Sequence, residues 1–200
     1  MANLTPADIL KLTDPNLARW FENDVDLERG LLYLGTGLDD ESPTTENMVK
    51  GLIALNARGQ VPRIKFLINS PGGDVGDGYA IYDLIKSSKI PVDTYVVGQA
   101  MSMAAVVLQA GETRLALPSA TIMVHNGSTN YGGESVEQTN LEAMGKWSEK
   151  DRKRMYRIFQ ERTGKPMNYW DKMCNPDYYM SAREAKKEGL IDKVTRKFVM

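Results

Sequence analysis

A serine and a histidine are the residues of this chain whose types and spacing could perform chemistry. The histidine, His125, is the only one in the sequence, and Ser102 precedes it in a run of small and apolar residues. A serine hydroxyl is a weak nucleophile at neutral pH, and it becomes effective when an imidazole takes its proton and donors stabilise the oxyanion. The pair predicts nucleophilic catalysis, although each residue alone is also typical of a polar helix start or a surface histidine.

The expected positions of these side chains suit such chemistry. Ser102 lies where an apolar strand is expected to turn into a helix, so the free backbone N–H groups of a first helical turn lie beside it. His125 ends a second apolar strand, and a glycine-containing loop follows it. The pair Gly72-Gly73 follows another strand and allows backbone amides to approach a ligand closely. This glycine pair is therefore a candidate source of an oxyanion donor, with a tight turn as the alternative interpretation.

An orienting acid for the imidazole is the third requirement of this chemistry. Spacing alone leaves four candidates open, namely Asp151, Asp171, Asp177 and Asp192. Asp177 is preferred because a turn at Asn175-Pro176 comes just before it and a capped helix begins shortly after it, which together anchor it on a defined loop.

The composition argues against several other functions. Lys and Arg number 25 and Asp and Glu 26, so the net charge of -1 gives no electrostatic argument for nucleic acid. The basic run of residues 150–157 includes an acidic residue and follows another, which is typical of a solvated helix face. The acidic glycine-rich stretch 72–78 matches no nucleotide-binding motif. With one histidine and one cysteine we expect no metal site, and no cofactor is predicted.

The location is predicted from the cysteine usage and from two segments. The lone cysteine, Cys174, cannot form an internal disulfide, which fits a reducing compartment. The first residues lack a basic segment followed by an apolar stretch, so no secretory signal is expected. The uncharged stretch 94–111 is 18 residues long, and its polar residues favour a buried strand and helix over a membrane span. We expect a soluble cytoplasmic protein.

The hydrophobic pattern predicts an α/β fold. Strands are expected at 31–34, 64–69, 92–97, 121–124 and 190–194, and helices around 48–58, 79–85, 101–110, 136–162 and 181–188. Because strand, loop and helix recur about every 30 residues, the sheet should be mostly parallel, with the loops at its carboxyl edge. Apolar helix faces are expected from Met48, Leu52, Ile53 and Leu55, and from Met144, Trp147, Met155, Ile158 and Phe159.

Four motifs in a fixed order resemble a known family. They are Ile68–Gly73, Gly98–Met103, Met123–His125, and Asp177–Ala182 followed by Glu184-Ala185 and Gly189–Asp192. Over about residues 31–194 the chain closely resembles the proteolytic subunit of the Clp proteases, the ClpP family.

The resemblance implies a ClpP/crotonase-like fold of repeated strand-strand-helix units with a protruding helical handle, here at about residues 128–163. It implies one peptidase domain over residues 31–200 after an N-terminal arm of residues 1–30. The activity implied is that of a serine endopeptidase acting through an acyl-enzyme. In this family pattern Ser102 is the nucleophile, His125 the general base and then acid, and Asp177 the orienting carboxylate. The backbone N–H groups of Gly73 and Met103 form the oxyanion hole.

The resemblance also implies an assembly, a homo-oligomer of heptameric rings stacked in pairs as a tetradecamer, which encloses a chamber for peptides or unfolded proteins. Lys65 and Ser87 stand where the family has aromatic residues that dock an ATP-dependent unfoldase, so the expectation of such a partner is weakened. Ala104 replaces a family glycine, and Asn126-Gly127 replaces Gln-Pro, which is expected to loosen the chain after the histidine.

Other functions remain open from the sequence. A phage capsid-maturation protease and a non-catalytic ring subunit are the main alternatives to the chambered peptidase. A crotonase-type acyl-CoA enzyme shares the fold, but it would not need Ser102 and His125 in these roles.

Overall fold

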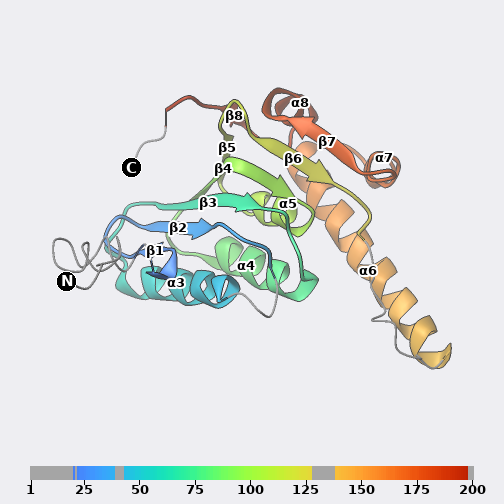
Figure 1. The fold of residues 1–200 in the computed structure, drawn as a ribbon, viewed down its shortest axis with the longest axis horizontal. Coiled ribbons are helices and arrows are strands. Elements are labelled where there is room, and N and C mark those ends of the chain that lie inside the picture. Colours follow the sequence, from blue (N-terminus) through green and yellow to red (C-terminus); the bar gives the residue numbers. More distant parts are fainter. Residues whose placement is uncertain (1–19, 21, 39–42, 128–137, 198–200) are drawn as a thin grey trace, which may run out of the picture.

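The computed structural model describes residue 20 and residues 22–38, 43–127 and 138–197. These residues form an α/β fold around one eight-stranded sheet (Figure 1). The strands are β1 (Val25–Asp26), β2 (Leu31–Leu34), β3 (Ile64–Ser70), β4 (Val92–Met101), β5 (Thr113–Ala116), β6 (Thr121–Val124), β7 (Tyr178–Ser181) and β8 (Lys193–Val194). The helices are α3 (Thr44–Arg58), α4 (Val75–Ser87), α5 (Met103–Leu108), α6 (Gln138–Thr163), α7 (Met167–Met173) and α8 (Ala182–Glu188).

The sheet is mostly parallel, as the sequence pattern predicts. Its main path runs β1-β2-β3-β4-β5-β8, and β6 pairs with β4 and β7. The pairs β1–β2 and β6–β7 are antiparallel, and the other pairs are parallel. Because β1 pairs with β2, the sheet begins before residue 31. The division into an N-terminal arm and a peptidase domain stays a prediction. Most of the expected arm lies outside the described residues.

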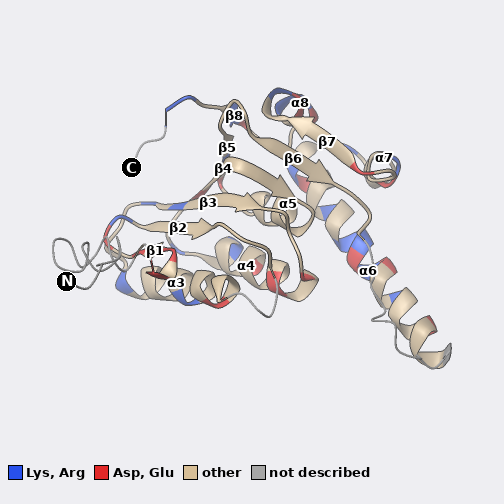
Figure 2. Ribbon diagram, viewed as in Figure 1, with Lys and Arg blue, Asp and Glu red and all other residues tan. Residues whose placement is uncertain are grey.

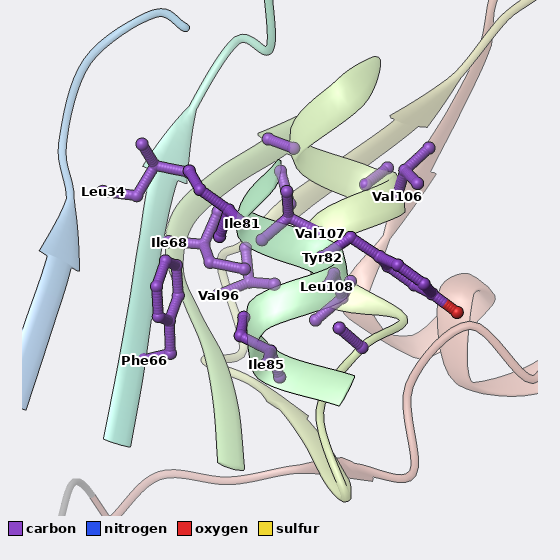
Figure 3. Close-up of a cluster of buried hydrophobic side chains, with 14 of the residues drawn as sticks. Leu34, Phe66, Ile68, Ile81, Tyr82, Ile85, Val96, Val106, Val107 and Leu108 are labelled. Carbon is purple, nitrogen blue, oxygen red and sulfur yellow. The ribbon is translucent and has the colours of Figure 1, made fainter. Parts of the chain in front are cut away.

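The core lies between the sheet and helices α3, α4 and α5 (Figure 1). Phe66 and Ile68 of β3 and Val96 of β4 are fully buried on this face, and Ile81 of α4 and Leu108 of α5 pack among them (Figure 3). Burying such side chains contributes about 1.5–3 kcal/mol each relative to exposure. The strands that carry the motif loops are therefore anchored in the buried core.

Strand β4 changes partners along its length, and this decides the geometry at its end. Val92–Val96 runs beside β3 and β5, whereas Gln99–Met101 pairs with β6. The sequence predicts a helix from residue 101, but Met101 is still in the strand because it pairs with Met123, and α5 begins at Met103. The carboxyl ends of β3, β4 and β6 thus meet at one edge of the sheet, where ligands of such folds bind.

Helix α6 projects away from the sheet, which matches the expected handle (Figure 1). In its second half Met155, Ile158 and Phe159 are buried, and the ring centroids of Phe159 and Trp170 lie 5.1 Å apart. The predicted apolar face does not continue, because Trp147 is 65% exposed and Met144 38% exposed. The first half of the helix extends beyond the core, so its apolar side chains cannot be buried against it.

The structure corrects other expectations. Ile53 of α3 is 54% exposed, whereas Met48, Leu52 and Leu55 are buried as predicted. Of the expected strand 190–194 only Lys193 and Val194 form β8. Sequence patterns did not predict β1, β5, β7 or α7, which are short or carry few apolar residues.

Charged side chains of both signs alternate along α6 (Figure 2). Glu149 and Lys153 pair at 2.6 Å with both side chains exposed, as expected of a solvated helix face. Across the described ranges, no helix combines the length and the apolar character needed to cross a bilayer.

Candidate active site

Ser102 occupies a strained turn between β4 and α5. Its backbone angles are φ 53 and ψ -124, and a positive φ is uncommon in a residue other than glycine. Its N–H donates to the carbonyl of Met123 at 3.0 Å, which fixes the turn to β6. Such strain costs of the order of 1–3 kcal/mol and persists when the surrounding structure enforces it, as it often does at reactive residues.

His125 links Ser102 to Asp177. Its Nε2 lies 2.8 Å from Ser102 Oγ, and its Nδ1 lies 3.3 Å from Asp177 Oδ1. The pairing of β6 with β7 explains this arrangement: Val124 is opposite Tyr178, so the next residues outward, 125 and 177, face each other. The side chain of His125 is 20% exposed and that of Asp177 is 52% exposed.

The other three candidate acids lie elsewhere. Asp151 lines the wall of the cleft on α6, Asp171 Oδ1 lies 3.1 Å from the hydroxyl oxygen of Tyr156, and Asp192 pairs with Arg114. Within the described part of the chain, Asp177 is the one carboxylate that makes an ion-pair contact with the imidazole. The structure thus places together the three side chains that the sequence singles out.

Two residues beside the site, Gly73 and Met103, have backbone amides that are not used within the described structure. The N–H groups of Gly73 and Met103 have no hydrogen-bond acceptor among the described residues. Met103 is the first residue of α5, and first-turn amides have no partner within a helix. Both residues line the cleft that contains Ser102 and His125. They can therefore donate to an oxyanion formed at a carbonyl attacked by the serine.

Leu38 holds Gly73 in place, and sequence reasoning missed it. Leu38 N–H donates to Gly72 O at 2.8 Å, and Leu38 O accepts from Asp74 N–H at 2.6 Å, so Gly73 is bracketed from both sides. A Cβ at Gly73 would lie 1.9 Å from Leu38 O, and one at Gly72 would lie 2.8 Å from Ser102 Cβ. Leu38 lies between Gly35-Thr36-Gly37 and a turn-rich stretch that begins at Asp39, and the local sequence carries no signal of this contact.

The cleft beside the site has a volume of about 1310 Å³ and lies between α4 and α6. Its walls include apolar side chains from both helices, namely Val75, Tyr79, Met144, Trp147 and Met155. Arg154 of α6 lies 3.6 Å from the centre of the Tyr79 ring and pairs with Asp83 at 3.1 Å. The guanidinium of Arg154 thus links α6 to α4, the two helices that form the walls of the cleft. The cleft is large enough to hold several residues of an extended peptide.

Cys174 is the other side chain with a nucleophilic atom that the sequence singles out. It is buried, and burial, reinforced by nearby Asp171, raises the pKa of its thiol to about 12. The thiol is therefore protonated at neutral pH and is not a nucleophile. Ser102 remains the residue with both an adjacent base and access to the cleft.

Ser102 contacts His125, and His125 contacts Asp177, beside two amides that have no acceptor among the described residues. On an α/β fold, this arrangement defines a site of the serine hydrolase type. The chain belongs to the Clp protease family, whose family model matches residues 24–198. It is 38% identical over 170 residues to the ATP-dependent Clp protease proteolytic subunit of Deinococcus radiodurans, a match that covers 84% of this chain and 81% of the relative. Membership in this family confirms the resemblance that the four motifs indicate.

Proposed function

We propose that this protein is a serine endopeptidase that hydrolyses peptide bonds in peptides or unfolded proteins through an acyl-enzyme on Ser102. The observation that carries the proposal is the 2.8 Å contact between Ser102 Oγ and His125 Nε2. Membership in the Clp protease family supports it independently. A non-catalytic ring subunit is disfavoured, because every side chain that the chemistry needs is in contact with its neighbour.

Each step of the proposed reaction is assigned to a group of this site. Ser102 Oγ attacks the scissile carbonyl carbon while His125 Nε2 takes the hydroxyl proton. The carbonyl oxygen becomes an oxyanion that the amides of Gly73 and Met103 stabilise. His125 then gives its proton to the leaving amine, and a water activated by the same nitrogen hydrolyses the ester. Asp177 accepts from Nδ1–H and keeps the imidazole in the required tautomer.

The proposal extends to an assembly of heptameric rings stacked in pairs. The Deinococcus relative is named a proteolytic subunit, and Leu141, Met144 and Trp147 expose apolar surface on the first half of α6. A closed chamber would let an unspecific peptidase work in the cytoplasm, the location that we propose. We do not extend the proposal to a standard ATP-driven unfoldase, because Lys65 and Ser87 replace two aromatic docking residues.

Labelling with a fluorophosphonate tests the proposal. We expect one adduct per chain on Ser102, with peptidase activity lost in proportion, because the reagent reacts with a serine activated by a base. Ser148 is an internal control, since it lines the same cleft without an imidazole beside it. Peptide mapping by mass spectrometry locates the adduct. Full labelling at another residue, or full activity after Ser102 is labelled, would refute the proposal.

Replacing Asp177 with asparagine should lower kcat by about 10²- to 10³-fold and change KM little. The amide can donate to Nδ1 and so favours the wrong imidazole tautomer, an effect of roughly 10⁴-fold where the acid is buried. Because Asp177 is 52% exposed, water can replace part of its interaction, and we expect a smaller loss. Steady-state kinetics on a fluorogenic peptide measure the effect, with Glu46→Gln on α3 as an exposed carboxylate control. A kcat within twofold of the parent would exclude Asp177 from this role.

A further inference from the structure

A buried tyrosine of the handle helix contacts the segments that carry His125 and Asp177. Tyr156 of α6 is 3% exposed. Its hydroxyl donates to Oδ1 of Asn126, the residue after His125, and lies 3.1 Å from Oδ1 of Asp171 on α7. The N–H of Asn126 in turn donates to the carbonyl of Cys174 at 3.0 Å. These contacts join the segment after β6 to the end of α7, just before Asp177.

The side chains of Tyr156, Asn126 and Asp171 form one hydrogen-bonded unit, and their donors and acceptors explain how. A tyrosine hydroxyl has one proton, so it serves one of the two oxygens at a time. If the Asn126 amide is rotated by 180°, its NH₂ group donates to the hydroxyl, which then donates to Asp171. Burial, with smaller contributions from Cys174 and Asp171, raises the pKa of Tyr156. The hydroxyl therefore stays protonated at neutral pH and remains a donor.

The contact between His125 and Asp177 does not by itself fix the orientation of the imidazole ring, so other contacts must hold the two segments in place. It spans 3.3 Å, and the carboxylate is half exposed, so its own energy cannot hold the ring in place. The pairing of β6 with β7 fixes the backbone on one side. On the other side, Asn126 is tied to Tyr156 and to the carbonyl of Cys174. This corrects the expectation that Asn126-Gly127 loosens the chain: Asn126 is anchored.

We propose that Tyr156 is a positioning residue whose hydroxyl, acting through Asn126, holds His125 in the orientation that peptide hydrolysis needs. The inference rests on the proposed peptidase function. It assigns a part in the reaction to a residue of the handle helix that makes no hydrogen bond to Ser102 or His125 within the described residues. It also gives Asn126, which replaces the family glutamine, a stated role.

The first experiment removes the hydroxyl and keeps the ring. Tyr156→Phe should lower kcat by about 10- to 100-fold, the range expected when a reacting group is displaced by up to 1 Å, with KM changed less than about twofold. The rate of Ser102 labelling by a small fluorophosphonate should fall in parallel, since it needs the imidazole but not extended peptide binding. The matched control is Tyr169→Phe on α7, which also removes a hydroxyl bonded to a carboxylate, that of Glu188, at 2.6 Å.

A double-mutant cycle separates positioning from a loss of stability. If the hydroxyl acts through Asn126, then Asn126→Ala should slow the enzyme by a similar factor, and the double variant should be no slower than the slower single variant. Two independent effects would instead multiply. Because Asn126 is only partly buried, its variant tests the same link even if Tyr156→Phe fails to fold.

The outcomes are distinct. The inference is overturned if Tyr156→Phe keeps the parent kcat, if the two effects multiply, or if Tyr169→Phe loses as much activity. Ser102→Ala is assayed beside these variants. If Ser102→Ala stays active, the proposed function itself fails; if it is inactive and Tyr156→Phe is fully active, only the positioning role fails.

Discussion

Replacing Ser102 with alanine is expected to lower the peptidase kcat by about 10⁴- to 10⁶-fold. The substitution removes the atom that forms the acyl-enzyme, and His125 is left without a proton to take. The amides of Gly73 and Met103 remain, so the residual reaction should still exceed hydrolysis in water by roughly 10³- to 10⁴-fold. Kinetics on a fluorogenic peptide, with active-site titration of the parent, measure the loss. Ser87→Ala, at the exposed end of α4, is the control.

A second variant at this position tests the strain that the turn imposes. Ser102→Gly should be as inactive as Ser102→Ala, but it should unfold at a higher temperature, because glycine adopts φ 53 at little cost. The difference in the free energy of unfolding should be about 1 kcal/mol or more. If the alanine variant keeps peptidase activity near that of the parent, the acyl-enzyme route is excluded. Equal stability of the two variants would show that the turn is not strained.

Replacing Gly73 with alanine is expected to lower kcat by at least about 10²- to 10³-fold, the typical cost of losing one oxyanion donor. Gly73 has φ 143, and a Cβ there would lie 1.9 Å from Leu38 O. Backbone atoms cannot yield to this clash as a flexible side chain can. The peptide must therefore rotate or the Leu38 segment must retreat, and either change turns the N–H away from the oxyanion.

Gly59→Ala is the matched control for this prediction. Gly59 also has a positive φ, of 61, but a Cβ there meets no atom within 4 Å, and it ends α3 away from the cleft. It should cost about 1 kcal/mol of stability and leave kcat unchanged. Stopped-flow acylation and thermal unfolding of both variants give the comparison. A Gly73→Ala variant that acylates as fast as the parent would remove Gly73 from the oxyanion hole.

Signals in the local sequence predicted those helices whose ends are set by residues close to them in the chain. The helix expected around 48–58 ends at Gly59, which has a positive φ, and the helix expected at 181–188 begins with the capping box of Ser181 and Glu184. The buried parallel strands appear in the sequence as continuous apolar runs, because both of their faces are covered. In contrast, β5 carries Arg114, which is buried and bound to Asp192, a partner far along the chain. A pattern search could not identify such a strand.

The sequence by itself determined which groups could react: one serine, one imidazole, a set of four acids and a glycine pair after a strand. Only the tertiary structure decided among the acids, because the antiparallel pairing of β6 with β7 is a contact between residues more than 50 positions apart and brings Asp177 opposite His125. The tertiary structure also fixed the turn at Ser102, because Ser102 is hydrogen-bonded to β6, and the conformation around Gly73, because Leu38 is hydrogen-bonded to the residues on both sides of it. Residue types and local spacing are carried by the chain itself, whereas distances between its distant parts exist only once the sheet has formed.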